Sequence, residues 1–200
     1  MHYSIKAGLE ARTVDSVVVS TEDAEIARVA RRLGAEVIDR PPELATDASP
    51  TIEAVLHAIG ALEARGQGPA AVVLLQPTSP LRLARDVDAA VRLFREGGCD
   101  SVVSVCPAAH PPHWALRIEQ GLLEPAFDPQ YLTRRRQDLP KTYEPNGAVF
   151  VSSPAALRAH NGFMAPRTRA YVMPPERSLD IDTELDLELA GFFMKRSGGR

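Results

Sequence analysis

Residues 71–82 have the sequence AVVLLQPTSPLR, and this stretch decides the fold. Its first half, residues 71–75, is uninterrupted by polar residues, which is typical of a strand buried on both faces of a parallel sheet. Its second half is polar, and two prolines stiffen the turn that follows the strand. Ligands of open α/β sheets bind beyond the carboxyl ends of the strands, where Gln76, Ser79 and Arg82 are therefore expected. The alternative is a turn that caps itself and leaves the arginine in solvent.

Short apolar runs alternate with helix-period segments on both sides of this stretch. Further strands are predicted at 17–19, 36–38, 101–105, 114–118, 148–151 and 170–173, and helices after 20–23, from 49, around 87–94 and from about 183. Apolar strands that alternate with helices predict an α/β fold, a three-layer Rossmann-like arrangement around a mostly parallel sheet. The proline-rich and charged stretch 107–143 breaks the alternation and is interpreted as an insertion, either a lid or a dimer arm.

Composition narrows the class of protein. The 200 residues fit one domain, and the formal net charge of -3 argues against a nucleic-acid groove. No apolar run approaches the roughly 20 residues that span a bilayer, and the first residues form no signal peptide. Two cysteines cannot build a disulfide framework, so a cytoplasmic protein is expected. Of the 23 basic residues, 20 are arginine, which indicates either codon bias or forks for carboxylate and phosphate.

Two acidic residues near the carboxyl end form a candidate metal site. Asp180 and Asp182 are two positions apart, so in an extended segment their side chains share a face. Paired carboxylates repel unless a cation lies between them, and oxygen ligands suit Mg²⁺. The alternative is that Asp182 caps the terminal helix while Asp180 is solvated.

Two further segments carry charge or polar groups toward the expected ligand side. Residues 134–136 are three consecutive arginines, which either attract an anionic small molecule or form a solvated loop. Arg40 follows a predicted strand, and Thr51 lies in the first turn of a predicted helix, where it can meet an anion or a base. No nucleophile elbow, Walker A sequence or dinucleotide fingerprint is present.

Taken in order, these motifs resemble the acylneuraminate cytidylyltransferases, also called CMP-sialic acid synthetases. Six stretches carry the resemblance, which extends from the first residues to about Leu189: 17–21, 40–45, 75–82, 136–140, 146–148 and 179–184. It implies one cytidylyltransferase-like domain over residues 1–200, with a dimerisation arm inserted at about 107–145. It also implies transfer of CMP from CTP to a sialic-type sugar acid with release of pyrophosphate, in a homodimer with Mg²⁺ as cofactor.

The resemblance implies roles for individual residues. Asp180 and Asp182 would hold the metal, and Gln76 would contact the sugar. The other implied substrate contacts are Arg136, Gln137, Asn146, Ser79 and Arg82. The implied nucleotide contacts are Ser20, Arg40 and Thr51.

The sequence departs from the family pattern at its start. Family members begin with a strand and a basic, glycine-rich loop that wraps the triphosphate, and neither occurs in residues 1–200. Either the start site is assigned too late, or the chain is a truncated form with little activity. The alternatives to a sialic-type enzyme are thus a non-catalytic protein that binds sugar or nucleotide, and a cytidylyltransferase for KDO or another sugar acid.

Overall fold

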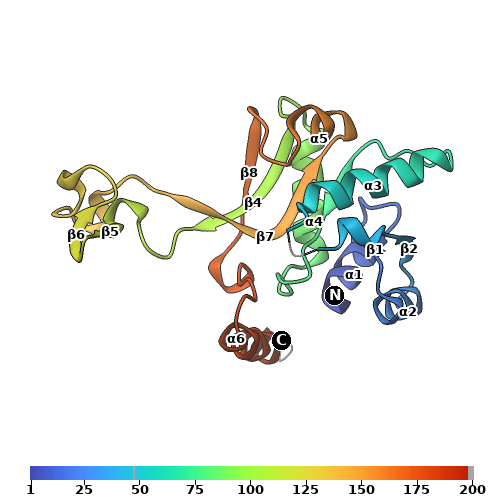
Figure 1. Ribbon diagram of the computed structural model, residues 1–200, viewed down its shortest axis with the longest axis horizontal. Coiled ribbons are helices and arrows are strands. Elements are labelled where there is room, and N and C mark those ends of the chain that lie inside the picture. The colour runs from blue at the N-terminus through green and yellow to red at the C-terminus, as the bar shows by residue number, and fades with distance from the viewer. Residues whose placement is uncertain (47, 198–200) are drawn as a thin grey trace.

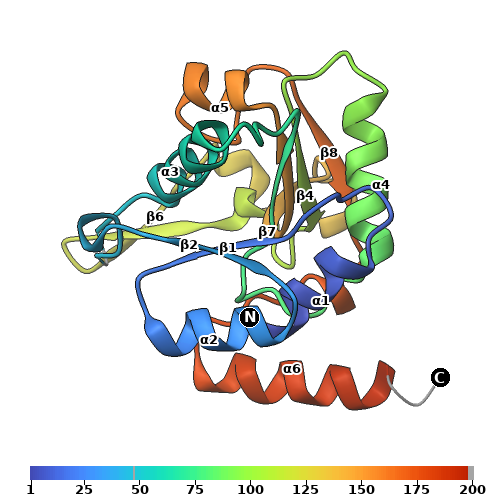
Figure 2. The same cartoon turned by 90° about the vertical axis from the view of Figure 1, so that its right-hand side faces the viewer.

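The computed structural model describes residues 1–46 and 48–197, which form layers of helix, sheet and helix (Figures 1 and 2). The strands are β1 Val18–Thr21, β2 Glu36–Asp39, β3 Val72–Leu74, β4 Ser101–Pro107, β5 Leu116–Glu119, β6 Leu122–Pro125, β7 Tyr143–Ser152 and β8 Thr168–Val172. The helices are α1 His2–Glu10, α2 Ala24–Arg32, α3 Thr51–Ala64, α4 Ala84–Arg95, α5 Pro154–His160 and α6 Glu184–Ser197. Of these, α5 and β6 were not predicted, and α1 was not among the helices expected from the sequence pattern.

The strands form a four-stranded sheet in the order β3-β7-β4-β8, a two-stranded sheet of β1 and β2, and a hairpin of β5 and β6. Strand β7 is antiparallel to both β3 and β4, whereas β4 is parallel to β8 and β1 is parallel to β2. The mostly parallel α/β sheet is therefore confirmed, with β7 as the reversed strand. One expectation is wrong: β3 is half-buried rather than buried on both faces, because it is an edge strand of its sheet.

The core fills both faces of the four-stranded sheet. Val102 of β4 packs in a cluster with Val87 and Val91 of α4, whereas the next residue, Val103, packs with Ile59 of α3 on the opposite face. This alternation follows from the period of two in a strand, whose successive side chains point to opposite faces. Helix α4 therefore covers one face of the sheet, and α3 with α5 covers the other.

Local chemistry sets the helix boundaries. The Asp23 carboxylate accepts a hydrogen bond of 2.8 Å from the backbone N–H of Ile26 and caps α2, and Gly34 ends that helix with φ of +93°. The helix predicted from residue 49 begins at Thr51, and the Ser49 hydroxyl does not cap it because it donates to the carbonyl of Glu43. The Asp23 cap therefore follows the carboxyl end of β1, and the Ser49–Glu43 hydrogen bond lies in the loop that follows β2.

Two segments extend beyond the layers. The chain between β4 and β7 forms an arm that projects away from the sheet and carries the β5–β6 hairpin (Figure 1). Helix α6 lies beyond α1 and α2, at the end of the molecule opposite α5 (Figure 2). Throughout the described ranges, every helix is too short or too polar to span a membrane.

Candidate active site

Three segments that are far apart in the sequence meet at Gly147 in β7. A Cβ atom at this position would lie 2.5 Å from Oε1 of Gln76, 2.5 Å from Oγ of Ser79 and 3.5 Å from Oδ2 of Asp180. The φ of +68° at Gly147 also favours glycine. The turn after β3 (residues 76–82), the middle of β7 and the acidic segment after β8 (residues 174–182) therefore form one site. A side chain at position 147 would collide with it.

Ser79 connects the turn after β3 to the acidic segment. Its buried hydroxyl lies 3.1 Å from the carbonyl oxygen of Asn146 and 3.2 Å from Oδ1 of Asp180. The backbone N–H of Ile181 donates to the carbonyl of Thr78 at 2.9 Å. One side-chain contact and one backbone hydrogen bond thus hold Asp180 against the turn.

Asp182 does not cap the terminal helix. The carboxylate of Asp186 accepts hydrogen bonds from the backbone N–H groups of Asp182 and Thr183, while Thr183 Oγ1 accepts from the N–H of Asp186. This reciprocal pair is a capping box, and the hydrogen bond from the Thr183 hydroxyl is the main cause of the lowered pKa of Asp186. Within residues 1–46 and 48–197, no hydrogen-bond donor reaches the exposed carboxylate of Asp182. The helix-cap alternative is therefore wrong.

The two carboxylates suit a cation that brings most of its own ligands. No cluster of three or more His, Cys, Asp or Glu side chains occurs in the described part of the chain. Mg²⁺ is commonly held by one or two carboxylates together with substrate phosphates and water, rather than by a cage of protein ligands. With one oxygen of Asp180 near Ser79 and the Asp182 carboxylate exposed, the donor set fits Mg²⁺ bound with a phosphate substrate.

Arg82 is a framework residue rather than the expected substrate contact. It is 2% exposed, and its Nε donates to the carbonyl of Ala148 at 2.5 Å. Its Nη1 donates to Ser4 Oγ in α1 at 2.7 Å, and its Nη2 donates to the carbonyl of Gln76. Burial lowers the pKa of Arg82 to about 10, although the charge of Asp180 opposes the shift. Arg82 does not face the ligand side, because these protein acceptors satisfy its buried guanidinium.

Asn146 is also buried, and its amide is occupied. Its Oδ1 accepts from Ser104 Oγ at 2.6 Å and from the N–H of Ala148 at 3.2 Å, while its Nδ2 donates to Ser178 Oγ at 2.8 Å. These contacts join β4 and β7 to the start of the acidic segment. The expected contact with a sugar is therefore corrected to a supporting role beneath the site.

The predicted nucleotide contacts gather around the two-stranded sheet. Ser20 lies in β1, Arg40 follows β2, and Thr51 is the exposed first residue of α3. Arg40 donates to Glu22 from Nε at 2.9 Å, and this hydrogen bond is the main cause of the lowered pKa of Glu22. The hydroxyl of Ser20 is buried with no hydrogen-bond partner in the described chain. Arg40 is thus already paired, whereas Ser20 and Thr51 keep free polar groups.

Arg136 and Gln137 are not brought to this site within one chain. Both are exposed in the short 3₁₀ helix Arg136–Asp138 of the arm, where Arg136 donates to the carbonyl of Ala108 at 3.4 Å. Among the residues that the structure describes, neither side chain bonds to Gln76, Ser79 or Asp180.

A buried cluster beside the site was not predicted. Asp86, in the first turn of α4, is 0% exposed and accepts hydrogen bonds from Arg177, Tyr171 and the backbone N–H of Leu83. Burial lowers the pKa of Arg177, but the hydrogen bonds and charge of Asp86 outweigh it and raise that pKa overall. In sequence, Asp86 looks like an ordinary acid of a first helical turn, and only the fold brings Arg177 to it.

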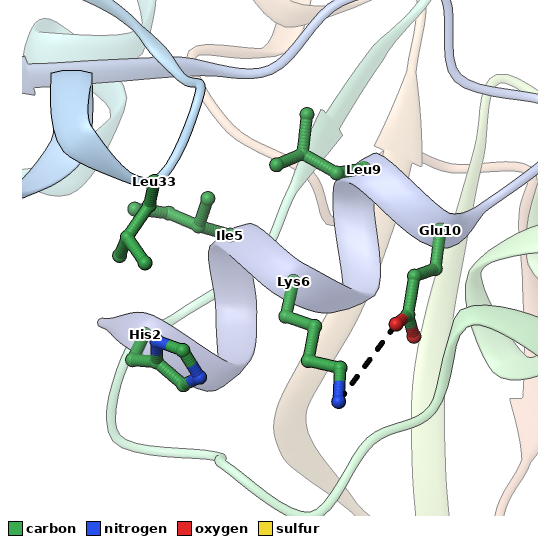
Figure 3. Close-up of a pocket in the computed structure, with 6 residues that line it drawn as sticks. All are labelled: His2, Ile5, Lys6, Leu9, Glu10 and Leu33. Atoms are coloured by element: carbon green, nitrogen blue, oxygen red, sulfur yellow. Dashed lines mark ion pairs between the residues drawn. The ribbon is translucent and has the colours of Figure 1, made fainter.

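Two cavities flank α1. One of about 370 Å³ is lined by α1, by residues of the turn after β3 and by Glu176 and Arg177. The other, of about 210 Å³, lies between α1 and Leu33 beside α2, where Lys6 and Glu10 form an ion pair of 3.8 Å (Figure 3). The second cavity contains none of the predicted site residues, so it is separate from the candidate active site.

A family model described as cytidylyltransferase matches residues 1–190. The N-acylneuraminate cytidylyltransferase of Escherichia coli is 32% identical over 189 residues, which are 94% of this chain and 44% of that protein. The chain thus spans less than half of that relative's length. The CMP-N,N'-diacetyllegionaminic acid synthase of Legionella pneumophila is 32% identical over 197 residues, which are 96% of this chain and 84% of that protein.

Solved structures support the same fold. The structure of CMP:2-keto-3-deoxy-manno-octonic acid synthetase complexed with CTP matches with a TM-score of 0.70 at 13% identity, covering 98% of this chain and 87% of that one. A 4-diphosphocytidyl-2C-methyl-D-erythritol synthase matches with a TM-score of 0.69, also at 13% identity, over 96% and 87% of the two chains. At this identity the likeness concerns the fold alone, and it supports a nucleotidyltransferase architecture.

Proposed function

The chain belongs to the cytidylyltransferase family, and from that premise we propose that it transfers CMP from CTP to a sialic-type nonulosonic acid. In this reaction the anomeric hydroxyl oxygen of the sugar loses its proton and bonds to the α-phosphorus, the bond from the α-phosphorus to the bridging oxygen breaks, and the proton and pyrophosphate leave. The observation that carries the proposal is the convergence of Gln76, Ser79 and Asp180 on Gly147. Relatives named for N-acylneuraminic, legionaminic and pseudaminic acids support the substrate class.

Asp180 and Asp182 are proposed to hold Mg²⁺ together with the triphosphate. When bound, Mg²⁺ supplies neutralisation of the charge on the phosphate oxygens, the chief requirement of phosphoryl-type transfer. Ser79 orients Asp180 through their contact of 3.2 Å, and the exposed carboxylate of Asp182 would hold the cation that neutralises the incoming phosphates. Two carboxylates and no third acidic or histidine ligand in the described chain agree with this division of ligands.

Gln76 is proposed to bind the sugar acid. Its half-buried side chain lies against Gly147, and in the described chain its amide has no hydrogen-bond partner. Its backbone carbonyl accepts from Arg82, so the turn is fixed while the side-chain amide stays available. A fixed backbone with a free amide is suited to orienting a hydroxyl for in-line attack.

Ser20, Arg40 and Thr51 are proposed to bind the nucleotide beside the two-stranded sheet. The buried, unpartnered hydroxyl of Ser20 and the exposed hydroxyl of Thr51 offer groups for a base or ribose. Arg40 would bind only by exchanging its ion pair with Glu22 for a contact with the ligand. Of the three residues, Arg40 therefore has to change partners when the nucleotide binds.

The protein is proposed to act as a homodimer in which each arm reaches the partner's site. The β5–β6 hairpin exposes apolar side chains, with Ile118 at 74%, Leu122 at 70% and Leu123 at 67%. A lone hairpin with such a surface is marginally stable in water, and exposed apolar patches mark interfaces. A partner's arm could bring Arg136 and Gln137 to the sugar carboxylate, which one chain does not do.

The proposed compartment is the cytoplasm. Cys99 and Cys106 are free thiols, as expected in a reducing compartment. Fractionation of the native host would test the assignment, and recovery outside the cytoplasm would contradict it.

Pyrophosphate release tests the activity. Purified protein is incubated with CTP, Mg²⁺ and, separately, sialic, legionaminic, pseudaminic and KDO-type acids, with CMP-sugar detected by mass spectrometry. Two proteins are assayed: residues 1–200, and a longer form that also includes any residues encoded in frame upstream of Met1. Turnover with a nonulosonic acid is expected, whereas turnover with KDO alone would reassign the substrate. Binding without turnover in both proteins would indicate a binding protein instead.

The carboxylate assignment is tested with Arg136→Ala. We expect the KM for the sugar acid to rise by about tenfold or more, because a charge-assisted contact is lost, while the KM for CTP changes little. Arg134→Ala is the matched control, since Arg134 is paired with Gln130 at 2.9 Å and stacks on Tyr131 within the arm. Equal effects on both KM values would place Arg136 elsewhere.

A further inference from the structure

The acidic segment after β8 is bound at Arg177 to the buried carboxylate of Asp86, which the proposed reaction does not use. Asp86 is 0% exposed, and its Oδ1 lies 2.9 Å from Nη2 of Arg177 while its Oδ2 lies 3.2 Å from Nε. Two parallel N–H···O bonds from one guanidinium fix both the distance and the orientation of the partner, which a point charge does not. Arg177 is therefore held in one place relative to α4.

This ion pair joins the two halves of the candidate active site. Helix α4 follows directly from the turn that contains Gln76 and Ser79, and Asp86 lies in its first turn. Arg177 lies three residues before Asp180, at the end of the 3₁₀ helix Pro175–Arg177. The separation between the turn and the two aspartates is thus set on one side by Asp86 and Arg177.

Packing alone does not hold the segment at this point. The cavity of about 370 Å³ is lined by Glu176 and Arg177 together with residues of the turn after β3, of α1 and of α6. The segment from Pro174 to Asp182 forms no strand, and its other anchors are single hydrogen bonds through Ser178, Asp180 and Ile181. Without the ion pair, the segment has room to shift into the cavity.

We propose that the Asp86–Arg177 ion pair is a positioning device that sets the geometry of Asp180 and Asp182, and so determines the affinity for the divalent cation with CTP, without touching either ligand. The inference rests on the proposed function. Tyr171 separates this role from general stability, because its hydroxyl donates to the same Asp86 oxygen at 3.0 Å from β8 and bonds to no residue of the segment.

The test compares Arg177→Met with Tyr171→Phe as the matched control. Arg177→Met removes both hydrogen bonds between the acidic segment and Asp86, whereas Tyr171→Phe removes one hydrogen bond to Asp86 and leaves the segment attached to it. Mn²⁺ binding in the presence of CTP is followed by electron paramagnetic resonance, alongside kcat, KM for the sugar acid and Tm. We expect Arg177→Met to weaken Mn²⁺ binding by about tenfold or more, in the range found when partners of metal ligands are removed. Tyr171→Phe should lower Tm but leave Mn²⁺ binding within about twofold of wild type.

Arg177→Lys serves if the methionine variant does not fold. It keeps the charge but loses the two-pronged geometry, so Mn²⁺ binding should fall between wild type and the methionine variant. Equal Mn²⁺ binding in wild type and both Arg177 variants would overturn the positioning role while leaving the proposed function intact. The positioning role would also be overturned if Mn²⁺ binding fell in proportion to Tm in all variants, Tyr171→Phe included. Wild-type protein that binds neither Mn²⁺ nor CTP would overturn both.

Discussion

The site around Gly147 and the arm between β4 and β7 handle polarity in opposite ways. At the site, Ser79, Arg82 and Asn146 are buried, and their polar groups are bonded to other segments of the chain. In the arm, Ile118 and Leu123 are apolar and face solvent, although they pair across the hairpin. A buried polar group needs a partner within the fold, whereas an exposed apolar surface gains by meeting another molecule.

The contrast shows which region is complete in one chain. The framework beneath the site is self-sufficient, because its buried donors and acceptors find each other across the sheet. The arm differs, since its apolar side chains are exposed in the described chain, and the proposed dimer would cover them. If this division is right, substitutions at the site act on chemistry or folding, and substitutions in the arm act on association.

The largest effect is expected at Asp182, the exposed acid of the candidate site. Asp182→Ala should lower Mg²⁺-dependent kcat by more than about a hundredfold, because metal coordination of a transferring phosphoryl group is worth several kcal/mol. The free energy of unfolding should stay within about 0.5 kcal/mol of wild type, as for exposed positions. Asp186→Ala is the control, expected to lower Tm through loss of the cap. An active Asp182→Ala enzyme would remove the metal role and blur the contrast.

Arg82 tests the completeness of the framework. Arg82→Met leaves the carbonyl of Ala148 without its donor and removes one donor each from the carbonyl of Gln76 and the hydroxyl of Ser4, so we expect a loss of about 3 kcal/mol in the free energy of unfolding. Urea denaturation measures it. Arg85→Met, at an exposed position of α4, should change stability by less than about 0.5 kcal/mol. Equal stabilities of the two variants would mean that the framework does not depend on the buried arginine.

Substitution in the hairpin tests the other side of the contrast. Ile118→Asp with Leu123→Asp should weaken self-association by about a hundredfold, since burying each side chain contributes about 1.5 kcal/mol or more. Multi-angle light scattering over a dilution series measures the change. The core should keep its Tm at monomer concentrations, because neither residue packs against the sheet. An unchanged mass would show that the arm is not the contact surface.

The sequence predicted the layers better than the partners of each side chain. Apolar runs such as 101–105 are local features, so the strands and the mostly parallel sheet could be predicted from them. The convergence on Gly147 depends on a reversed strand, β7, which brings residues 146–148 beside the turn after β3. The expected ligand contact of Arg82 is wrong because a polar residue after a strand end has the same sequence pattern whether it faces solvent or protein, and the contact of Asn146 was implied by the resemblance alone. Asp86 was missed because its partner lies 91 residues away.

The smallest effect is expected from pH, at the edge of the framework. Burial raises the pKa of Tyr171 to about 12 from 10.0, with the charge of Asp86 and the hydrogen bond to it adding to the shift. Between these pH values the unfolded chain has lost the phenol proton while the folded chain keeps it, so stability is full below pH 10 and falls as pH rises toward 12. We expect about 1 kcal/mol of this loss to be absent in Tyr171→Phe, since the phenol is only part-buried. Urea denaturation at pH 9 and pH 11 measures it, and an identical pH slope in both proteins would show that the Tyr171–Asp86 contact is not maintained in solution.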